Sequence, residues 1–141
     1  MYETHPQRGK SILESLPGFP GDVVQIAFQH HENNIGTGYP LHLSQARIHP
    51  LAKIIHLADE FFHLCLKYKQ MEEKPWSAAL KELWELRGPE IEPLPLKALM
   101  ELFDYPVPTP LLKMKATNWT ERRKSVQNAG QQSVHCEVFL L

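Results

Sequence analysis

Apolar residues recur at every third or fourth position between residues 50 and 69, and this recurrence constrains the fold more than any other feature. The periodic positions are Leu51, Ile54, Ile55, Ala58, Phe61, Phe62, Cys65 and Leu66. Such spacing places the side chains on one side of an α-helix. Pro50 suits the first helical turn, where its fixed φ is favourable and no backbone N–H is needed. The pattern therefore predicts a long central helix from Pro50 to about Lys69.

Shorter apolar patterns bounded by proline and glycine lie on either side of this segment. Pro6 fits a first turn, Asp22 is a plausible N-cap for a mostly buried helix, and Pro75 opens another helix that Gly88 stops. The predicted helices span residues 6–16, 22–32, 75–87 and 94–103. Residues 33–40 are rich in Asn and Gly and are predicted to form a loop. The fold class is therefore all-α, a helical bundle of about five helices.

The pattern changes in the C-terminal part of the chain. Residues 117–132 are polar and basic and are predicted to be loop, whereas residues 134–141 favour β-structure. The tail is therefore expected to be irregular or to form a short β-strand, as an edge strand or as a segment that docks on a partner. We divide the chain into a helical domain at residues 1–104 and an extension at residues 105–141.

Charge and composition exclude several classes of protein. The 141 residues include 15 basic and 16 acidic side chains, so the net charge of -1 gives no general attraction to nucleic acid. No apolar run is long enough to span a membrane, and the polar N-terminus does not resemble a signal peptide. Cys65 and Cys136 lack zinc-ligand spacing and are predicted to be reduced thiols. These features predict a cytoplasmic protein with no nucleic-acid or membrane partner.

Eight histidines are the outstanding feature of the composition. His30 and His31 lie at the predicted end of a helix, where they can interact with its dipole or act as ligands. His56, Asp59 and His63 are spaced so that all three can share one helix face. Such a face can bind a metal, but a solvated polar stripe is the favoured interpretation for His56 and His63.

Several short motifs occur in a fixed order along the chain. His5, Pro6 and Gly9 have the form His-Pro-x-x-Gly, followed by His30-His31-Glu32 and then by Gly36-Thr37-Gly38-Tyr39-Pro40. Residues 54–59 read Ile-Ile-His-Leu-Ala-Asp, and further matches extend to about Phe103. In these motifs and their order the chain resembles the HD-GYP family of metal-dependent cyclic di-GMP phosphodiesterases.

The resemblance implies a site as well as a fold. It implies a helical bundle, two or three iron or manganese ions, a bridging hydroxide and a cyclic dinucleotide substrate. The implied metal ligands are His5, His30, His31 and Asp59, and the implied substrate loop contains Gly38, Tyr39 and Pro40. No residue is assigned a catalytic role of its own. Imidazole and carboxylate ligands suit iron and manganese, and they also suit zinc.

The chain departs from the family pattern at three points. It contains no His-Asp dipeptide, Ile35 replaces a usual aspartate, and residues 67–69 read Lys-Tyr-Lys instead of Arg-Pro-Tyr. We therefore expect an incomplete metal site in a domain truncated at its N-terminus, with weak or no hydrolysis by this chain alone. The alternatives are a non-catalytic signalling module that binds a nucleotide or a protein, and a structural domain without a ligand. Missing N-terminal helices would expose an apolar patch, which predicts a protein partner or a homodimer.

Overall fold

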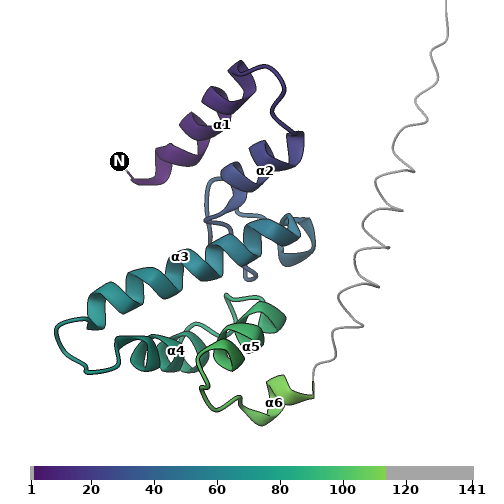
Figure 1. The fold of residues 1–141 in the computed structure, drawn as a ribbon. Helices are drawn as coiled ribbons and strands as arrows, with labels where there is room; N and C mark the ends of the chain where they lie inside the picture. Colours follow the sequence, from purple (N-terminus) through teal and green to yellow (C-terminus); the bar gives the residue numbers. More distant parts are fainter. Residues whose placement is uncertain (1, 114–141) are drawn as a thin grey trace, which may run out of the picture. The chain divides into compact units, whose positions relative to one another are not determined.

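All regular structure within residues 2–113, the part of the chain that this computed structural model describes, is helical (Figure 1). The α-helices are α1 (His5–Ser15), α2 (Gly21–Gln29), α3 (Pro50–Tyr68), α4 (Pro75–Glu85), α5 (Pro93–Leu102) and α6 (Thr109–Leu112), with short 3-10 helices at Tyr2–Thr4 and Gln45–Arg47. The all-α prediction is confirmed for this range. The predicted loop at 117–132 and the β-prone tail at 134–141 lie outside it.

Contacts divide the chain into one unit at residues 1–106 and a second at residues 107–141. The first unit contains α1 to α5, and the second contains α6. The helix α6 was not predicted, because its four residues are too few to show a period. No helix in the described part combines the length and the apolarity needed to cross a bilayer.

Proline lies in the first two positions of five of the six α-helices of the described part. The sequence predicts this for α1, α3 and α4, whereas α2 differs from its prediction. Its N-cap is Pro20, and Asp22 lies within the first turn, where a carboxylate interacts favourably with the helix dipole. The helix ends at Gln29 and not near Glu32, so the two histidines follow it directly. The expectation of a mostly buried helix is also wrong, because Gln29 is its only buried residue.

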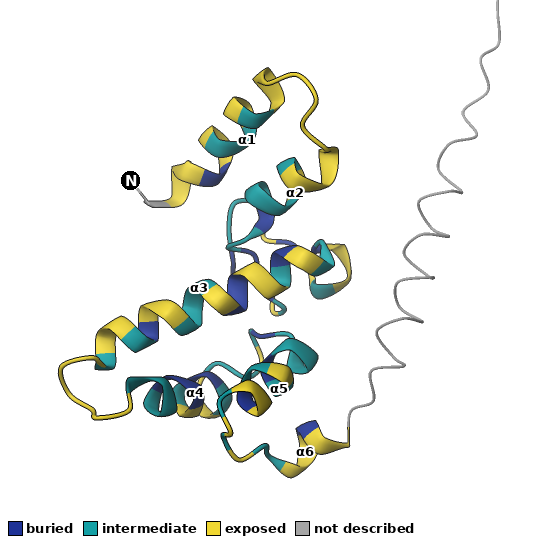
Figure 2. Cartoon of the chain, viewed as in Figure 1, coloured by how far each residue is buried: buried dark blue, intermediate teal, exposed yellow. Residues whose placement is uncertain are grey.

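The main core lies between α3, α4 and α5 (Figure 2). Its largest fully buried side chains are Leu80, Leu83, Ile91, Leu96 and Met100. At one edge of it, Phe103 packs against Phe61 and Trp76, with ring centroids 5.1 and 5.6 Å apart. A smaller buried cluster of Leu43, Ile48 and Ala52 connects the long loop to the first turns of α3. This packing fixes α3, from which Asp59 and His56 reach the histidine region.

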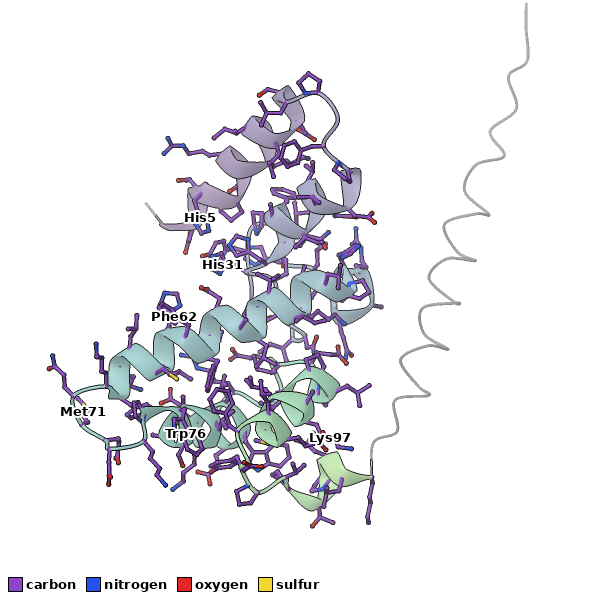
Figure 3. The ribbon with its side chains drawn as sticks, viewed as in Figure 1. His5, His31, Phe62, Met71, Trp76 and Lys97 are labelled. Carbon is purple, nitrogen blue, oxygen red and sulfur yellow. The ribbon has the colours of Figure 1, made fainter. Side chains whose placement is uncertain are left out.

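The periodic apolar residues that predict α3 are mostly not its buried face. Five large ones are exposed, namely Leu51, Ile54, Ile55, Phe62 and Leu66, and we call this set the α3 stripe. The buried residues of the helix are Ala52, His56, Leu57 and Leu64. Phe62, with 60% of its surface exposed, projects away from α4 (Figure 3). The helix is therefore apolar on both sides, and only one side is covered in this unit.

Candidate metal centre

Three histidines meet where the start of α1 lies beside the end of α2. His5 is the first residue of α1, and His30 and His31 follow α2. The Nε2 atom of His5 lies 3.0 Å from Nε2 of His30 and 3.0 Å from Nε2 of His31. One nitrogen from each ring lies within 4.8 Å of the others, so the group could hold a metal ion. His5 and His31 are seen close together in Figure 3.

The protonation of these rings supports a cation site. The Nδ1–H of His30 donates to the backbone carbonyl of Ala27 at 2.8 Å, which leaves Nε2 of His30 with its lone pair directed at His5. A proton on Nε2 of His5 can form a hydrogen bond with Nε2 of His30 or with Nε2 of His31, but not with both. A cation in the middle would satisfy all three nitrogens together, and a ligand histidine commonly uses its other nitrogen as His30 does.

Asp59, a residue of α3, lies close to this group on the side of His31 that faces away from His5. Its carboxylate lies 3.8 Å from Nδ1 of His31, the nitrogen that is turned away from His5, and 3.4 Å from Nδ1 of His63. Asp59 is thus close to the cluster but is not one of its three converging groups. A carboxylate beside the outer nitrogen of a ligand histidine orients that ring and increases its basicity. His63 itself is exposed.

The electrostatics of the cluster keep His31 neutral. Burial of the ring is the main cause, followed by charges on His30 and His5, and together they lower the pKa of His31 to about 4. Asp59 acts in the opposite direction but does not outweigh them. At neutral pH the imidazole is therefore unprotonated, which is the form that binds metals.

The loop after His31 is held against the cluster by hydrogen bonds. The side-chain oxygen of Asn33 accepts the N–H groups of Thr37 and Gly38 at 3.0 and 3.1 Å. The N–H of Tyr39 donates to the carbonyl of His31 at 3.1 Å. The Tyr39 ring then stacks on the His31 ring, with centroids 4.6 Å apart and planes 22° apart.

Gly38 is required by this close approach. A Cβ at this position would overlap the carbonyl oxygen of His31 and would lie 2.6 Å from the backbone nitrogen of Asn33. Gly38 is buried, whereas Tyr39 and Pro40 are half-buried at the edge of the site. The structure therefore brings the three residues of the implied substrate loop beside the histidines, and their contact with a substrate stays a prediction.

His56 does not belong to a solvated stripe, and that prediction is wrong for this residue. The side chain is buried, and its Nδ1–H donates to the backbone carbonyl of His30 at 3.2 Å. Burial lowers the pKa of His56. Its Nε2 atom is buried without a hydrogen-bond partner in the described part of the chain. His63, two turns further along the helix, is exposed as the stripe predicts.

Two buried polar residues near the site were not identified from the sequence. Glu32 accepts hydrogen bonds from the loop, and the side-chain oxygen of Gln29 accepts the N–H of His49 at 2.7 Å. In the sequence, Glu32 stands out only as part of the His-His-Glu motif. A glutamate between an apolar helix and a glycine-rich loop is a signal from which a buried carboxylate could be predicted, whereas nothing in the sequence distinguishes Gln29.

Comparison with known proteins agrees with this geometry. Residues 1–93 match the family described as HD domain. A cyclic di-GMP phosphodiesterase of Pseudomonas aeruginosa is 30% identical over 106 residues, which cover 73% of this chain and 25% of that protein. A cyclic di-GMP phosphodiesterase of Thermotoga maritima is 31% identical over 79 residues, which cover 56% of this chain and 22% of that protein. No solved structure matches the chain.

The two relatives are matched over only part of their own length, whereas the family match covers most of this chain. The chain spans about a quarter of the length of the two relatives. The family match covers most of the chain and includes all three clustered histidines and Asp59. HD domains are metal-dependent, and the cluster supplies a group of ligands that could hold the metal. The chain therefore belongs to the HD domain family and is HD-GYP-like.

Proposed function

We propose that this chain is a metal-dependent phosphohydrolase domain related to cyclic di-GMP phosphodiesterases, with an incomplete metal site and weak or no hydrolysis on its own. The observation that carries the proposal is the convergence of one ring nitrogen each from His5, His30 and His31. We assign this function to residues 1–104, separate from the extension at 105–141. We place it in the cytoplasm, where a free cysteine such as Cys65 stays reduced.

The three histidines would hold a divalent cation, with Asp59 as a further ligand or as the outer partner of His31. Iron and manganese suit this set of donors, as does zinc. A bound cation would polarise a phosphodiester and lower the pKa of a water molecule. The chain's own contribution is to keep His31 neutral and to fix the rings through Ala27 and Tyr39.

The loop beside the cluster supports a nucleotide substrate. Tyr39 and Pro40 are only half-buried, and Tyr39 stacks on His31, so a phosphodiester bound at the cation would lie next to them. Both relatives are named as cyclic di-GMP phosphodiesterases. We therefore propose a cyclic dinucleotide as the ligand, with Gly38, Tyr39 and Pro40 as its binding loop.

The incompleteness of the site follows from charge. An imidazole that binds a metal is an uncharged ligand, so a set of three histidines and Asp59 supplies one negative charge. Two divalent cations a few ångströms apart repel each other strongly unless carboxylates lie between them. The sequence has no His-Asp dipeptide to supply a bridging aspartate. The described cluster suits a single cation, which weakens any reaction that needs two.

Metal content and hydrolysis test the proposal. The full chain, purified without chelator, is expected to contain iron, manganese or zinc near one equivalent, and His30→Ala is expected to lose it. His63→Ala, which removes an exposed histidine, is the matched control and is expected to keep it. Any cyclic di-GMP hydrolysis is expected to fall in His30→Ala and in Asp59→Asn. Wild-type chain that binds no metal, or hydrolysis that survives both substitutions, would contradict the proposal.

A second candidate function, a non-catalytic interaction module, is favoured by the exposed α3 stripe. We propose a second copy of the chain as the partner. Leu51 and Leu66 lie equally far from the midpoint between Ala58 and Asp59, and so do Ile55 and Phe62. Antiparallel packing of two α3 helices about that midpoint would pair each of these residues with its counterpart, as a two-fold symmetric interface requires.

Light scattering over a range of concentrations tests this second candidate. The wild-type chain is expected to dimerise, and Phe62→Lys is expected to be monomeric because it places a charge in the stripe. Met71→Lys changes an exposed apolar residue outside the stripe and is expected to leave dimerisation unchanged. A wild-type chain that remains monomeric at its highest soluble concentration would exclude the homodimer.

A further inference from the structure

Glu32, the residue after His31, is a buried carboxylate with an unusual set of partners. Only 1% of its surface is exposed. One carboxylate oxygen accepts the N–H of Leu41 at 2.6 Å, and the other accepts the N–H of Leu43 at 2.8 Å. Among residues 2–113, no lysine, arginine or histidine forms an ion pair with it. Backbone N–H groups alone therefore compensate for a charge that is costly to bury.

These two bonds fix the far end of the loop that carries Tyr39. Asn33 holds the near end through the N–H groups of Thr37 and Gly38. Tyr39 lies between the two anchored points, and its ring is stacked on His31. Because both ends are fixed, the stacked ring has little freedom to move away, and it limits the rotation of the His31 imidazole.

We propose that Glu32 is a positioning residue for the metal site. It anchors the loop, the loop holds Tyr39 against His31, and the stack directs Nε2 of His31 towards His5. This inference rests on the proposed metal-binding function and assigns to Glu32 a role that needs no contact with the metal. Glutamine cannot replace it, because its amide NH2 would face one of the two backbone N–H donors.

The competing explanation is that Glu32 only stabilises the fold. The two explanations differ in what happens to His31 in a variant that remains folded. A residue of purely structural importance lowers the free energy of unfolding and leaves the His31 ring and the metal affinity of the folded protein unchanged. A positioning residue changes both, because outer-shell partners of ligand histidines typically affect metal affinity by about 10- to 100-fold.

The test compares Glu32→Gln with Glu82→Gln in the full 141-residue chain. Glu82 is a matched control, because its side chain is 10% exposed and makes polar contacts with Lys67 and Tyr68 between α3 and α4. Mn²⁺ affinity is measured by calorimetry, and the His31 imidazole is followed by NMR without metal. Glu32→Gln is expected to bind Mn²⁺ about 10- to 100-fold more weakly and to shift the His31 signal. Glu82→Gln is expected to change neither.

The results for these variants either support or overturn the positioning role of Glu32. Wild-type Mn²⁺ affinity and an unshifted His31 signal in folded Glu32→Gln would overturn it. If Glu32→Gln does not fold, Tyr39→Leu takes its place, since it keeps the buried carboxylate and removes the stacked ring. Unchanged affinity and an unshifted His31 signal in Tyr39→Leu would also overturn the inference. If the wild-type chain binds no Mn²⁺, the proposed function fails, and the NMR signal alone still decides whether Glu32 positions His31.

Discussion

The two parts of the first unit are held together by different forces. The part formed by α3, α4 and α5 buries leucine, isoleucine and methionine side chains, five of them completely. In the part formed by α1, α2 and the following loop, most of the buried residues next to the histidines are polar or glycine, namely Gln29, Glu32, Asn33 and Gly38, with Pro6 as the apolar exception. The stabilising core and the candidate metal centre are therefore built from different kinds of contact.

Because of this difference, the stability of the unit and the geometry of the candidate metal centre depend on different residues. Apolar burial is strong and non-directional, whereas a typical hydrogen bond contributes about 1 kcal/mol of net stability but fixes a distance and an angle. The histidines depend on directional contacts, such as the bond from His30 to Ala27 and the bond from Tyr39 to His31. We expect the α1–α2 part to open locally at a lower free energy than global unfolding requires.

The largest effect is expected from a cavity in the α3–α5 core. Leu83→Ala removes a completely buried side chain and should lower the free energy of unfolding by about 2 to 5 kcal/mol. Ile12→Ala, at a position in α1 that is 61% exposed, should change it by less than about 0.5 kcal/mol. Urea denaturation measures both. If both variants lost the same free energy of unfolding, the α3–α5 part would not be the main source of stability.

Metal binding should strengthen the weaker part. At a free Mn²⁺ concentration 100 times its dissociation constant, the free energy of unfolding should rise by about 2.7 kcal/mol, because the cation binds the folded state. Hydrogen exchange in α1 and α2 should slow by the same free energy, because the openings that expose these helices release the cation. His30→Ala should show neither change. Exchange in α1 and α2 that stays at its metal-free rate in saturating Mn²⁺ would mean that the cation does not bind at this end of the unit.

Alanine at Gly38, where the loop backbone approaches His31 and Asn33 closely, should lower both the free energy of unfolding and the affinity for Mn²⁺. Gly38→Ala forces Cβ against the backbone of His31 and Asn33, so we expect a loss of about 1 to 3 kcal/mol in unfolding free energy. It should also weaken Mn²⁺ binding, since Tyr39 follows directly. Gly9→Ala, where a Cβ meets nothing within 4 Å, is the control. If Gly38→Ala bound Mn²⁺ with the wild-type affinity, the loop would not contribute to the metal site.

Acid should destabilise the metal-free protein through His31 and His56. The unfolded chain protonates His31 near pH 6.5, whereas the folded chain does so near pH 4, so protons favour the unfolded state. The free energy of unfolding should therefore fall as the pH falls from about 6.5 to about 4, and burial of His56 acts in the same direction. His31→Gln should fall less steeply over this range. Identical slopes for this variant and the wild type would refute the assignment.

The smallest effect is expected at His63. The side chain is exposed, and its contacts are with Asp59 and with the neighbouring Phe62 ring on the same helix, so His63→Ala should change the unfolding free energy by less than about 0.5 kcal/mol. Mn²⁺ affinity should stay at the wild-type value. A large loss of affinity would bring His63 into the metal site and extend the candidate centre along α3.

Local signals made the helices predictable. Pro50 and Pro75 begin α3 and α4 as their position before an apolar pattern indicates, and the glycine-rich loop follows α2 as expected. The resemblance to HD-GYP proteins identified the three histidines that the structure brings together. A prediction failed where the environment of a side chain decided the outcome: His56 is buried and is not part of a solvated stripe. The apolar period predicted α3 but did not indicate that the α3 stripe would be exposed.

The helical class and the helix starts follow from the chain's local patterns, because helix propensity, proline geometry and apolar period act between neighbouring residues. Which face of α3 is covered, and the place of Asp59 beside the outer nitrogen of His31, follow only from the folded arrangement. The same holds for Glu32 as the anchor of the loop. Burial and hydrogen-bond geometry depend on residues that are distant in sequence, and no local pattern records where those residues meet.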